Sequence, residues 1–132
     1  MAGINWWAVL AAAAASFLLG GPWYSKALFL NAWQREAGDM RVPGADKHPA
    51  RVFGLAFLFS LVAAACFAVV LGPQPALSTA LSYGLLAGAG LVATSFGINY
   101  QFANRSLALW LIDGGYHTVQ FLLFGLVLGL WH

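Results

Sequence analysis

The sequence has very little charge. Lysine, arginine, aspartate and glutamate together make up 8% of its 132 residues, whereas a soluble domain carries roughly a quarter. Most of the charged side chains fall within residues 35–51, and none occurs from Val52 to Asn104. This scarcity excludes a soluble globular enzyme, a disordered chain and a nucleic-acid-binding protein, which needs clustered basic surface. Since 61% of the residues are hydrophobic, the composition indicates an integral membrane protein.

Cysteine and the common catalytic motifs are also scarce. Cys66 is the single cysteine, so no disulfide can form within the chain, and we interpret it as a small lipid- or helix-facing residue. The sequence has no zinc-ligand spacing, nucleophile elbow, phosphate-binding loop or dinucleotide fingerprint. It therefore predicts no metal site, cofactor or catalytic residue, and it favours a non-enzymatic role while leaving that question open.

Four apolar stretches are each long enough to cross a bilayer, whose core of about 30 Å needs about 20 apolar residues in a helix. They cover about residues 5–21, 51–71, 77–102 and 107–131. Short loops between them make neighbouring helices antiparallel. Because backbone groups in lipid must be satisfied internally, we predict an all-α fold, a single membrane domain of four transmembrane helices.

The region around the first span has two further features. No lysine or arginine precedes the first span, so we predict a retained span and not a cleaved signal peptide. Residues 27–37 combine apolar and charged side chains after Pro22, which predicts a short interfacial helix. Residues 38–49 read as an irregular loop, the end of a cytoplasmic segment covering about residues 26–49.

The basic residues predict the orientation. Five of the six lie between the first and second spans, and the sixth, Arg105, lies between the third and fourth. The positive-inside rule places both of these loops in the cytoplasm and both termini outside. Tryptophan and tyrosine near the predicted span ends agree with this register, because their rings prefer the membrane interface.

Small residues recur at four-residue spacing in every predicted span. The third span carries Gly84 and Gly88, and the fourth carries Gly125 and Gly129. Small residues let helices approach closely in lipid, so these stripes predict a tight four-helix bundle. Packing within one chain is the favoured use of the stripes. We also predict that at least one glycine stripe, Gly84/Gly88 or Gly125/Gly129, contacts another protein chain.

A polar stripe lies within the fourth span. Asp113, His117 and Gln120 share one helical face, and such residues usually face a bundle interior. The antiparallel third span brings Ser95 and Asn99 to a similar depth. We therefore predict one buried hydrogen-bonded cluster in which His117 faces inward.

The cluster has two interpretations. In the favoured one it is a clamp that fixes the register of neighbouring helices. In the other, Asp113 and His117 form a proton-handling or ligand-binding pair, because a carboxylate raises the basicity of imidazole. Tyr116 points elsewhere on the helix.

Two stretches carry a family resemblance. The first is Gly-Gly-Pro-Trp-Tyr-Ser at residues 20–25, followed by Leu28, Phe29 and Trp33. The second joins residues 93–100 to residues 109–117, which end in Gly-Gly-Tyr-His. Together they resemble the uncharacterised bacterial membrane family known as domain of unknown function 1761. The resemblance implies four spans in a bacterial cell (inner) membrane and no established activity. This family often has asparagine where this chain has Asp113, which leaves Tyr116 and His117 as hydrogen-bonding residues.

Three functions agree with this sequence. The leading hypothesis is a structural or accessory subunit of a larger membrane assembly, or a homo-oligomer, because the chain has little extramembrane mass. The second is a small transporter or channel subunit, which would need oligomerisation to line a pathway. The third is a membrane binder or enzyme for a lipid, quinone or pigment, with Tyr116 and His117 at its site. The expected partners are the bilayer, other membrane subunits or copies, and a lipid-like ligand.

Overall fold

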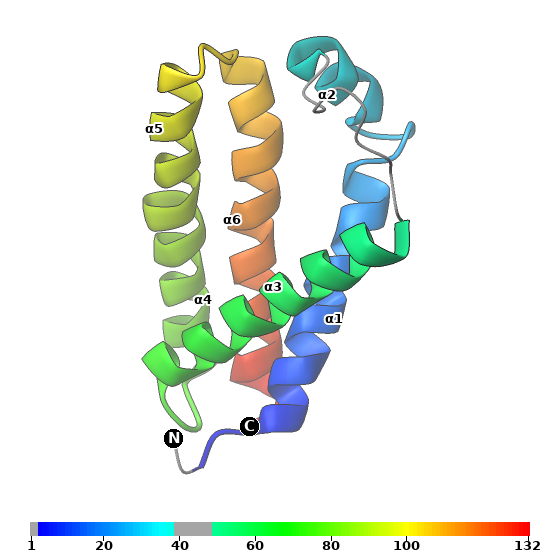
Figure 1. The fold of residues 1–132 in the computed structure, drawn as a ribbon. Coiled ribbons are helices and arrows are strands. Elements are labelled where there is room, and N and C mark those ends of the chain that lie inside the picture. The colour runs from blue at the N-terminus through cyan, green and yellow to red at the C-terminus, as the bar shows by residue number, and fades with distance from the viewer. Residues whose placement is uncertain (1–2, 39–48) are drawn as a thin grey trace.

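A computed structural model describes residues 3–38 and 49–132, which form helices and contain no strand (Figure 1). In chain order the elements are α1 (Trp6–Trp23), α2 (Leu30–Ala37), α3 (Pro49–Leu71), α4 (Leu77–Leu85), the π-helix η1 (Leu86–Ala93), α5 (Thr94–Phe102) and α6 (Leu107–Leu130). Because α4, η1 and α5 form one continuous helix, four helices are long and apolar enough to cross a membrane. The predicted all-α fold with four such helices is confirmed.

Local chemistry explains where the helices begin and end. The side chain of Asn5 accepts a hydrogen bond from the backbone nitrogen of Ala8, and Ser106 does the same for Leu109 at the start of α6. These are N-cap contacts that satisfy otherwise unpaired donors. Gly72, at a φ of +79°, follows the last residue of α3, a backbone conformation that favours glycine.

The first helix extends through Pro22 before the chain turns. Pro22 has no backbone N–H to donate to the carbonyl of Leu18, and the helix ends one residue later, at Trp23. The Ser25 hydroxyl then donates a hydrogen bond to the Pro22 carbonyl. The short helix predicted after this point begins three residues later than expected, at Leu30. The predicted loop beyond it falls largely on residues 39–48, which lie outside the described part of the chain.

The two ends of the bundle differ. The start of α1, the end of α6 and the α3–α4 turn lie at one end, whereas α2 and the α5–α6 turn lie at the other (Figure 1). At the second end, Nη1 of Arg105 donates a hydrogen bond of 2.9 Å to the carbonyl of Ala37. The two loops that carry the described basic residues are therefore neighbours. Their assignment to the cytoplasm stays a prediction.

Small residues fill the centre of the bundle. Alanines of α1 and α3 pack with Phe67 and with Phe124 and Leu128 of α6 in one buried cluster. Ala8, Ala12 and Ala64 are fully buried. Because an alanine side chain is short, α1 and α3 can approach closely along this line.

The four glycines of the predicted stripes lie where α4 and η1 meet α6. A Cβ added to Gly88 would lie 2.7 Å from Cα of Thr118, and one added to Gly84 would meet the backbone of Phe121. Gly125 and Gly129 face Ala80 and Leu77 in the same way. These faces are thus filled by helices of the same chain. The contact of one glycine stripe with a second chain stays a prediction.

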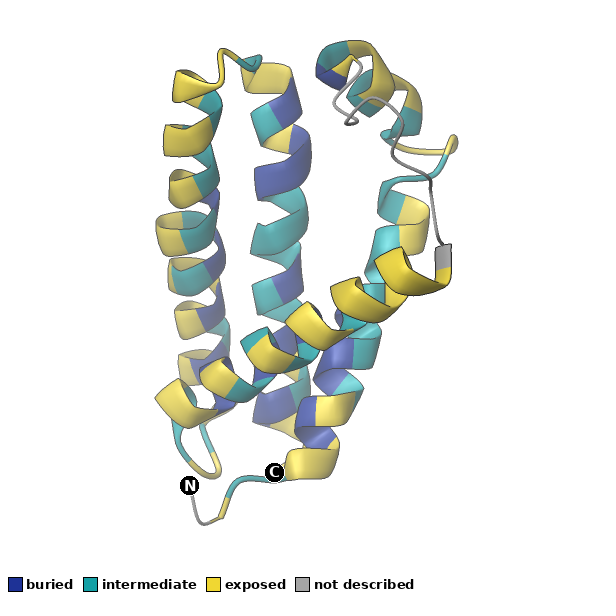
Figure 2. Cartoon of the chain, in the orientation of Figure 1, coloured by how far each residue is buried: buried dark blue, intermediate teal, exposed yellow. Residues whose placement is uncertain are grey.

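The N-terminal half of α3 stands apart from the bundle. This helix crosses the others obliquely (Figure 1), and residues 50–56 are all exposed (Figure 2). In this half, Phe53 and Phe57 meet Phe17 of α1 edge to face, with ring centroids 6.1 and 5.7 Å apart. The tilt of α3 separates it from η1 and α5 at that end of the molecule.

Candidate functional site

Asp113 lies at the centre of the most connected polar cluster among the described residues. Its Oδ1 accepts hydrogen bonds from the hydroxyl of Tyr24 at 2.6 Å and from Nε1 of Trp33 at 3.1 Å. Its Oδ2 accepts one from the hydroxyl of Tyr100. Asp113 itself is buried. One carboxyl group therefore ties α6 to α2, to α5 and to the residue that follows α1.

The three donors are neutral groups, which suits a carboxylate that has left water. A buried carboxylate is tolerated when its oxygens accept several hydrogen bonds. Tyr24 lies just beyond α1, and burial together with its hydrogen bond to Asp113 raises its pKa above the ordinary value. Its hydroxyl thus stays protonated and available as a donor.

Further aromatic side chains fix the helices around this carboxyl group. Nε1 of Trp23 donates to the carbonyl of Ile112 at 2.9 Å, and Nε1 of Trp110 donates to the carbonyl of Ala93 at 2.7 Å. The Tyr116 hydroxyl donates to the carbonyl of Ser16 at 2.9 Å. These bonds link α6 to α1 on one side and to η1 on the other. Tyr116 is thus a structural link beside the carboxyl cluster.

His117 and Gln120 form a separate polar branch. Nδ1 of His117 lies 2.7 Å from Oε1 of Gln120, and Nε2 of Gln120 donates to the hydroxyl oxygen of Ser16 at 3.4 Å. The His117 ring stacks on Phe96 with a centroid distance of 4.9 Å. The predicted pairing of His117 with Asp113 is therefore wrong, because each side chain bonds to other partners.

Ser95 and Asn99 lie outside the cluster. Both are exposed on the outer face of α5, and the Ser95 hydroxyl donates to the carbonyl of Leu91 in its own helix. The reason is the π-helix, whose hydrogen bonds span five residues and not four. The buried positions consequently run from Gly88 to Ala93, a step of five. In an uninterrupted α-helix, Ser95 and Asn99 would lie on the same face as Gly88. The longer step to Ala93 rotates both of them away from that face.

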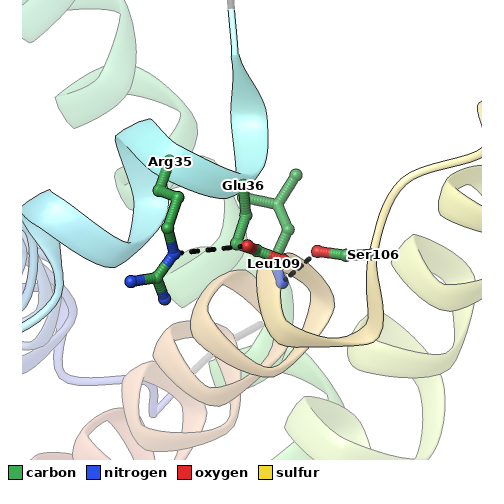
Figure 3. Close-up of polar contacts among 4 residues, drawn as sticks. All are labelled: Arg35, Glu36, Ser106 and Leu109. Carbon is green, nitrogen blue, oxygen red and sulfur yellow. Dashed lines mark hydrogen bonds and ion pairs between the residues drawn. The ribbon is translucent and has the colours of Figure 1, made fainter.

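The short helix α2 is held at two more points. Arg105 satisfies the carbonyl of Ala37 at the helix C-terminus, where a cation is favourable. Figure 3 shows Glu36 beside Ser106, and Nε of Arg35 lies 3.4 Å from the Glu36 carboxylate. The Ser106 hydroxyl first and Arg35 second hold the pKa of Glu36 below its ordinary value. Together with Trp33, the contacts with Arg105 and Ser106 hold α2 beside the start of α6.

Sequence reasoning missed the three donors to Asp113. Tyr24 and Trp33 lie 89 and 80 residues away in the chain, and Tyr100 lies near the end of a predicted span, where tyrosine is also expected at the membrane interface. All three belong to the stretches that carry the family resemblance. Their presence in the same two stretches as Asp113 could have indicated this pairing. A buried acid needs hydrogen-bond donors, and buried tyrosine and tryptophan side chains need acceptors.

The cluster joins several elements of the fold through one carboxyl group. The oxygens of Asp113 accept hydrogen bonds that hydroxyl and indole groups donate. Among residues 3–38 and 49–132, no group of three or more histidine, cysteine or acidic side chains could hold a metal ion.

The fold and this cluster define a class: small helical proteins with four long apolar helices that can span a membrane and with a buried carboxyl group that ties α6 to α2, to α5 and to the residue after α1. The chain belongs to the family described as "Protein of unknown function (DUF1761)", whose model matches residues 7–129. The resemblance drawn from the sequence is thereby confirmed. Neither the curated proteins nor the solved structures include a match.

Proposed function

We propose that this protein is a structural subunit of a membrane assembly, formed with its own copies or with other membrane proteins. The proposal rests on the outer strip of the third membrane helix, which we define as Ser78, Ser82, Gly90 and Thr94. All four residues are exposed. In a bilayer, small and polar residues are typical of surfaces that pack against another helix.

The strip is well suited to close helix contact. A Cβ added to Gly90 would meet nothing within 4 Å. The hydroxyls of Ser82 and Thr94 donate to carbonyls of their own helix, those of Ser78 and Gly90. Their hydrogens are thus satisfied, while the small side chains leave room for a neighbouring backbone.

The exposed face of α3 provides the contrast. It carries Val52, Leu55, Phe59, Val62 and Val69, all of them apolar and largely exposed. Such a face suits lipid chains, which are as apolar as these side chains. The outward placement of serine and threonine on the third helix, whereas Ser60 of α3 is buried, is the observation that carries the proposal.

Native mass spectrometry from lipid nanodiscs tests it. A complex heavier than the 14.0 kDa chain is expected, and Gly90→Leu with Thr94→Leu should reduce it to the single chain. Val62→Leu, on the apolar face of α3, is the matched control and should leave the mass unchanged. A complex with a multiple of the chain mass would identify a homo-oligomer. A complex that contains an additional protein would identify an accessory subunit. A parent that is already monomeric, or a mass that the double variant does not change, would contradict the proposal.

A further inference from the structure

An apolar cavity opens between α3 and the third membrane helix. Its volume is about 420 Å³, within the range of about 300–1,000 Å³ typical of ligand pockets. One wall is formed by Ala63, Cys66 and Val70 of α3, and the other includes Tyr83 and Ala87, with Phe121 of α6 also lining the space. Its lining consists almost entirely of hydrocarbon side chains, so it suits a hydrocarbon chain.

A second cavity continues the first along the same helix. It has a volume of about 280 Å³ and is lined by Leu91, Val92, Ser95, Phe96 and Asn99. Leu91 and Val92 line both cavities. The two therefore form one trough along η1 and α5, which ends near the α2 end of the bundle.

The two parts of the trough differ in the polarity of their lining residues. Its first part offers hydrocarbon, whereas its second part adds the exposed hydroxyl of Ser95 and the exposed amide of Asn99. Ser95 donates its hydrogen to Leu91, so its oxygen remains an acceptor. The Asn99 amide can both donate and accept. A molecule that fits must carry a hydrocarbon chain and, near Asn99, a polar group that both donates and accepts hydrogen bonds.

The lack of charged side chains among the described lining residues restricts the class of ligand further. None of the described residues that line the two cavities is charged. A charged head group in this part of the trough would find no opposite charge there, and burying an unpaired charge is strongly unfavourable. The head group is therefore neutral, and the need for a donor favours a hydroxyl-bearing group over a quinone ring, which only accepts.

We infer that the trough binds a neutral single-chain lipid whose hydroxyl-bearing head group hydrogen-bonds to Ser95 and Asn99. The chain lies between α3 and the third membrane helix, and the head group lies at the α2 end. This site is distinct from the Asp113 cluster and from the outer strip, so it adds a ligand to the proposed structural role.

Retention of monoolein by the purified full chain tests the inference. After detergent exchange, native mass spectrometry should show one bound monoolein per chain. Methyl oleate has the same chain but no hydroxyl, and it should bind about fivefold more weakly, as expected for the loss of one hydrogen bond of about 1 kcal/mol. Phosphatidylglycerol, which has two chains and a charge, should not compete.

Three variants separate this site from ordinary lipid contact. Leu91→Trp fills the trough where its two parts meet and should abolish retention. Asn99→Leu should reduce the preference for monoolein over methyl oleate to near one. Ile98→Trp, at an exposed position of the same helix outside the trough, should bind like the parent, and so should Gly90→Leu. Equal retention of monoolein and methyl oleate by the parent, or full retention by Leu91→Trp, would overturn the inference and leave bulk lipid as the occupant.

Discussion

Nε1 of Trp33 donates a hydrogen bond of 3.1 Å to Oδ1 of Asp113, 80 residues further along the chain. This bond joins an eight-residue helix to the N-terminal part of α6, a helix that can span the membrane. A helix of that length is marginal on its own in water. Its position therefore depends on tertiary contacts, which include the bond to Asp113 and the bond from Arg105 to Ala37.

Asp113 should act through hydrogen bonding more than through charge. Asp113→Leu leaves the donors of Tyr24, Trp33 and Tyr100 without their acceptor, and an unsatisfied buried group costs about 1–3 kcal/mol. Asp113→Asn keeps one acceptor oxygen, and the Tyr100 hydroxyl can rotate to accept from the new amide. We expect a loss of at least about 2 kcal/mol of unfolding free energy for leucine and less than about 1 kcal/mol for asparagine. Reversible unfolding in mixed detergent micelles, followed by circular dichroism, measures both. Equal losses would mean that the ionised carboxylate itself is required.

The glycines between η1 and α6 should be intolerant of even one methyl group. Gly88→Ala places a Cβ 2.7 Å from Cα of Thr118, so the two helices must separate, and overpacking of this kind costs about 1–3 kcal/mol. Gly54→Ala is the matched control, because a Cβ there meets nothing within 4 Å. The same unfolding assay should show destabilisation for Gly88→Ala and none for Gly54→Ala. Equal behaviour would contradict the close approach of η1 and α6.

Glu36 offers a direct pH test of the contact between α2 and α6. The Ser106 hydroxyl and Arg35 hold the pKa of Glu36 below its ordinary value of 4.5. A lowered pKa means that this contact stabilises the docked α2 above pH 4.5 and is lost as the pH falls through the pKa of the folded protein. Glu36 is the only glutamate, so carbon NMR of glutamate-labelled protein follows it alone. The midpoint should rise in Ser106→Ala, and an unchanged midpoint would show that Ser106 does not bind this carboxylate.

The orientation can be tested at two exposed glutamines, Gln34 on α2 and Gln74 in the α3–α4 turn. The distribution of basic residues predicts that α2 lies in the cytoplasm. In a Cys66→Ala background, a membrane-impermeant maleimide added to intact cells should label Gln74→Cys and should reach Gln34→Cys only after lysis. The reverse labelling pattern would invert the topology.

Much of the fold could be predicted from local patterns of apolar, small and charged residues in the sequence. Apolar length located the four long helices, and the spacing of Gly84, Gly88, Gly125 and Gly129 pointed to close helix packing. The amphipathic stretch after Pro22 indicated α2. These features are local, so a sequence can display them without knowledge of tertiary contacts.

The candidate site was predictable only in part. The sequence showed that Asp113 needs hydrogen-bond partners, but two of its donors lie beyond the first predicted span, where no periodicity links them to the fourth. The π-helix also escaped detection, because its extra residue per turn leaves no mark on an apolar composition. That step is the reason why Ser95 and Asn99 face outward.

Cross-linking in native membranes tests the proposed assembly most directly. Cysteine at Gly90, in a Cys66→Ala background, should form an oxidised product heavier than the 14.0 kDa chain, either with a copy or with a partner captured by a short bis-maleimide. Cysteine at Val62, on the apolar face of α3, should remain uncross-linked under the same conditions. Cross-linking at Val62 with none at Gly90 would contradict the account, because the contact surface would then lie on α3.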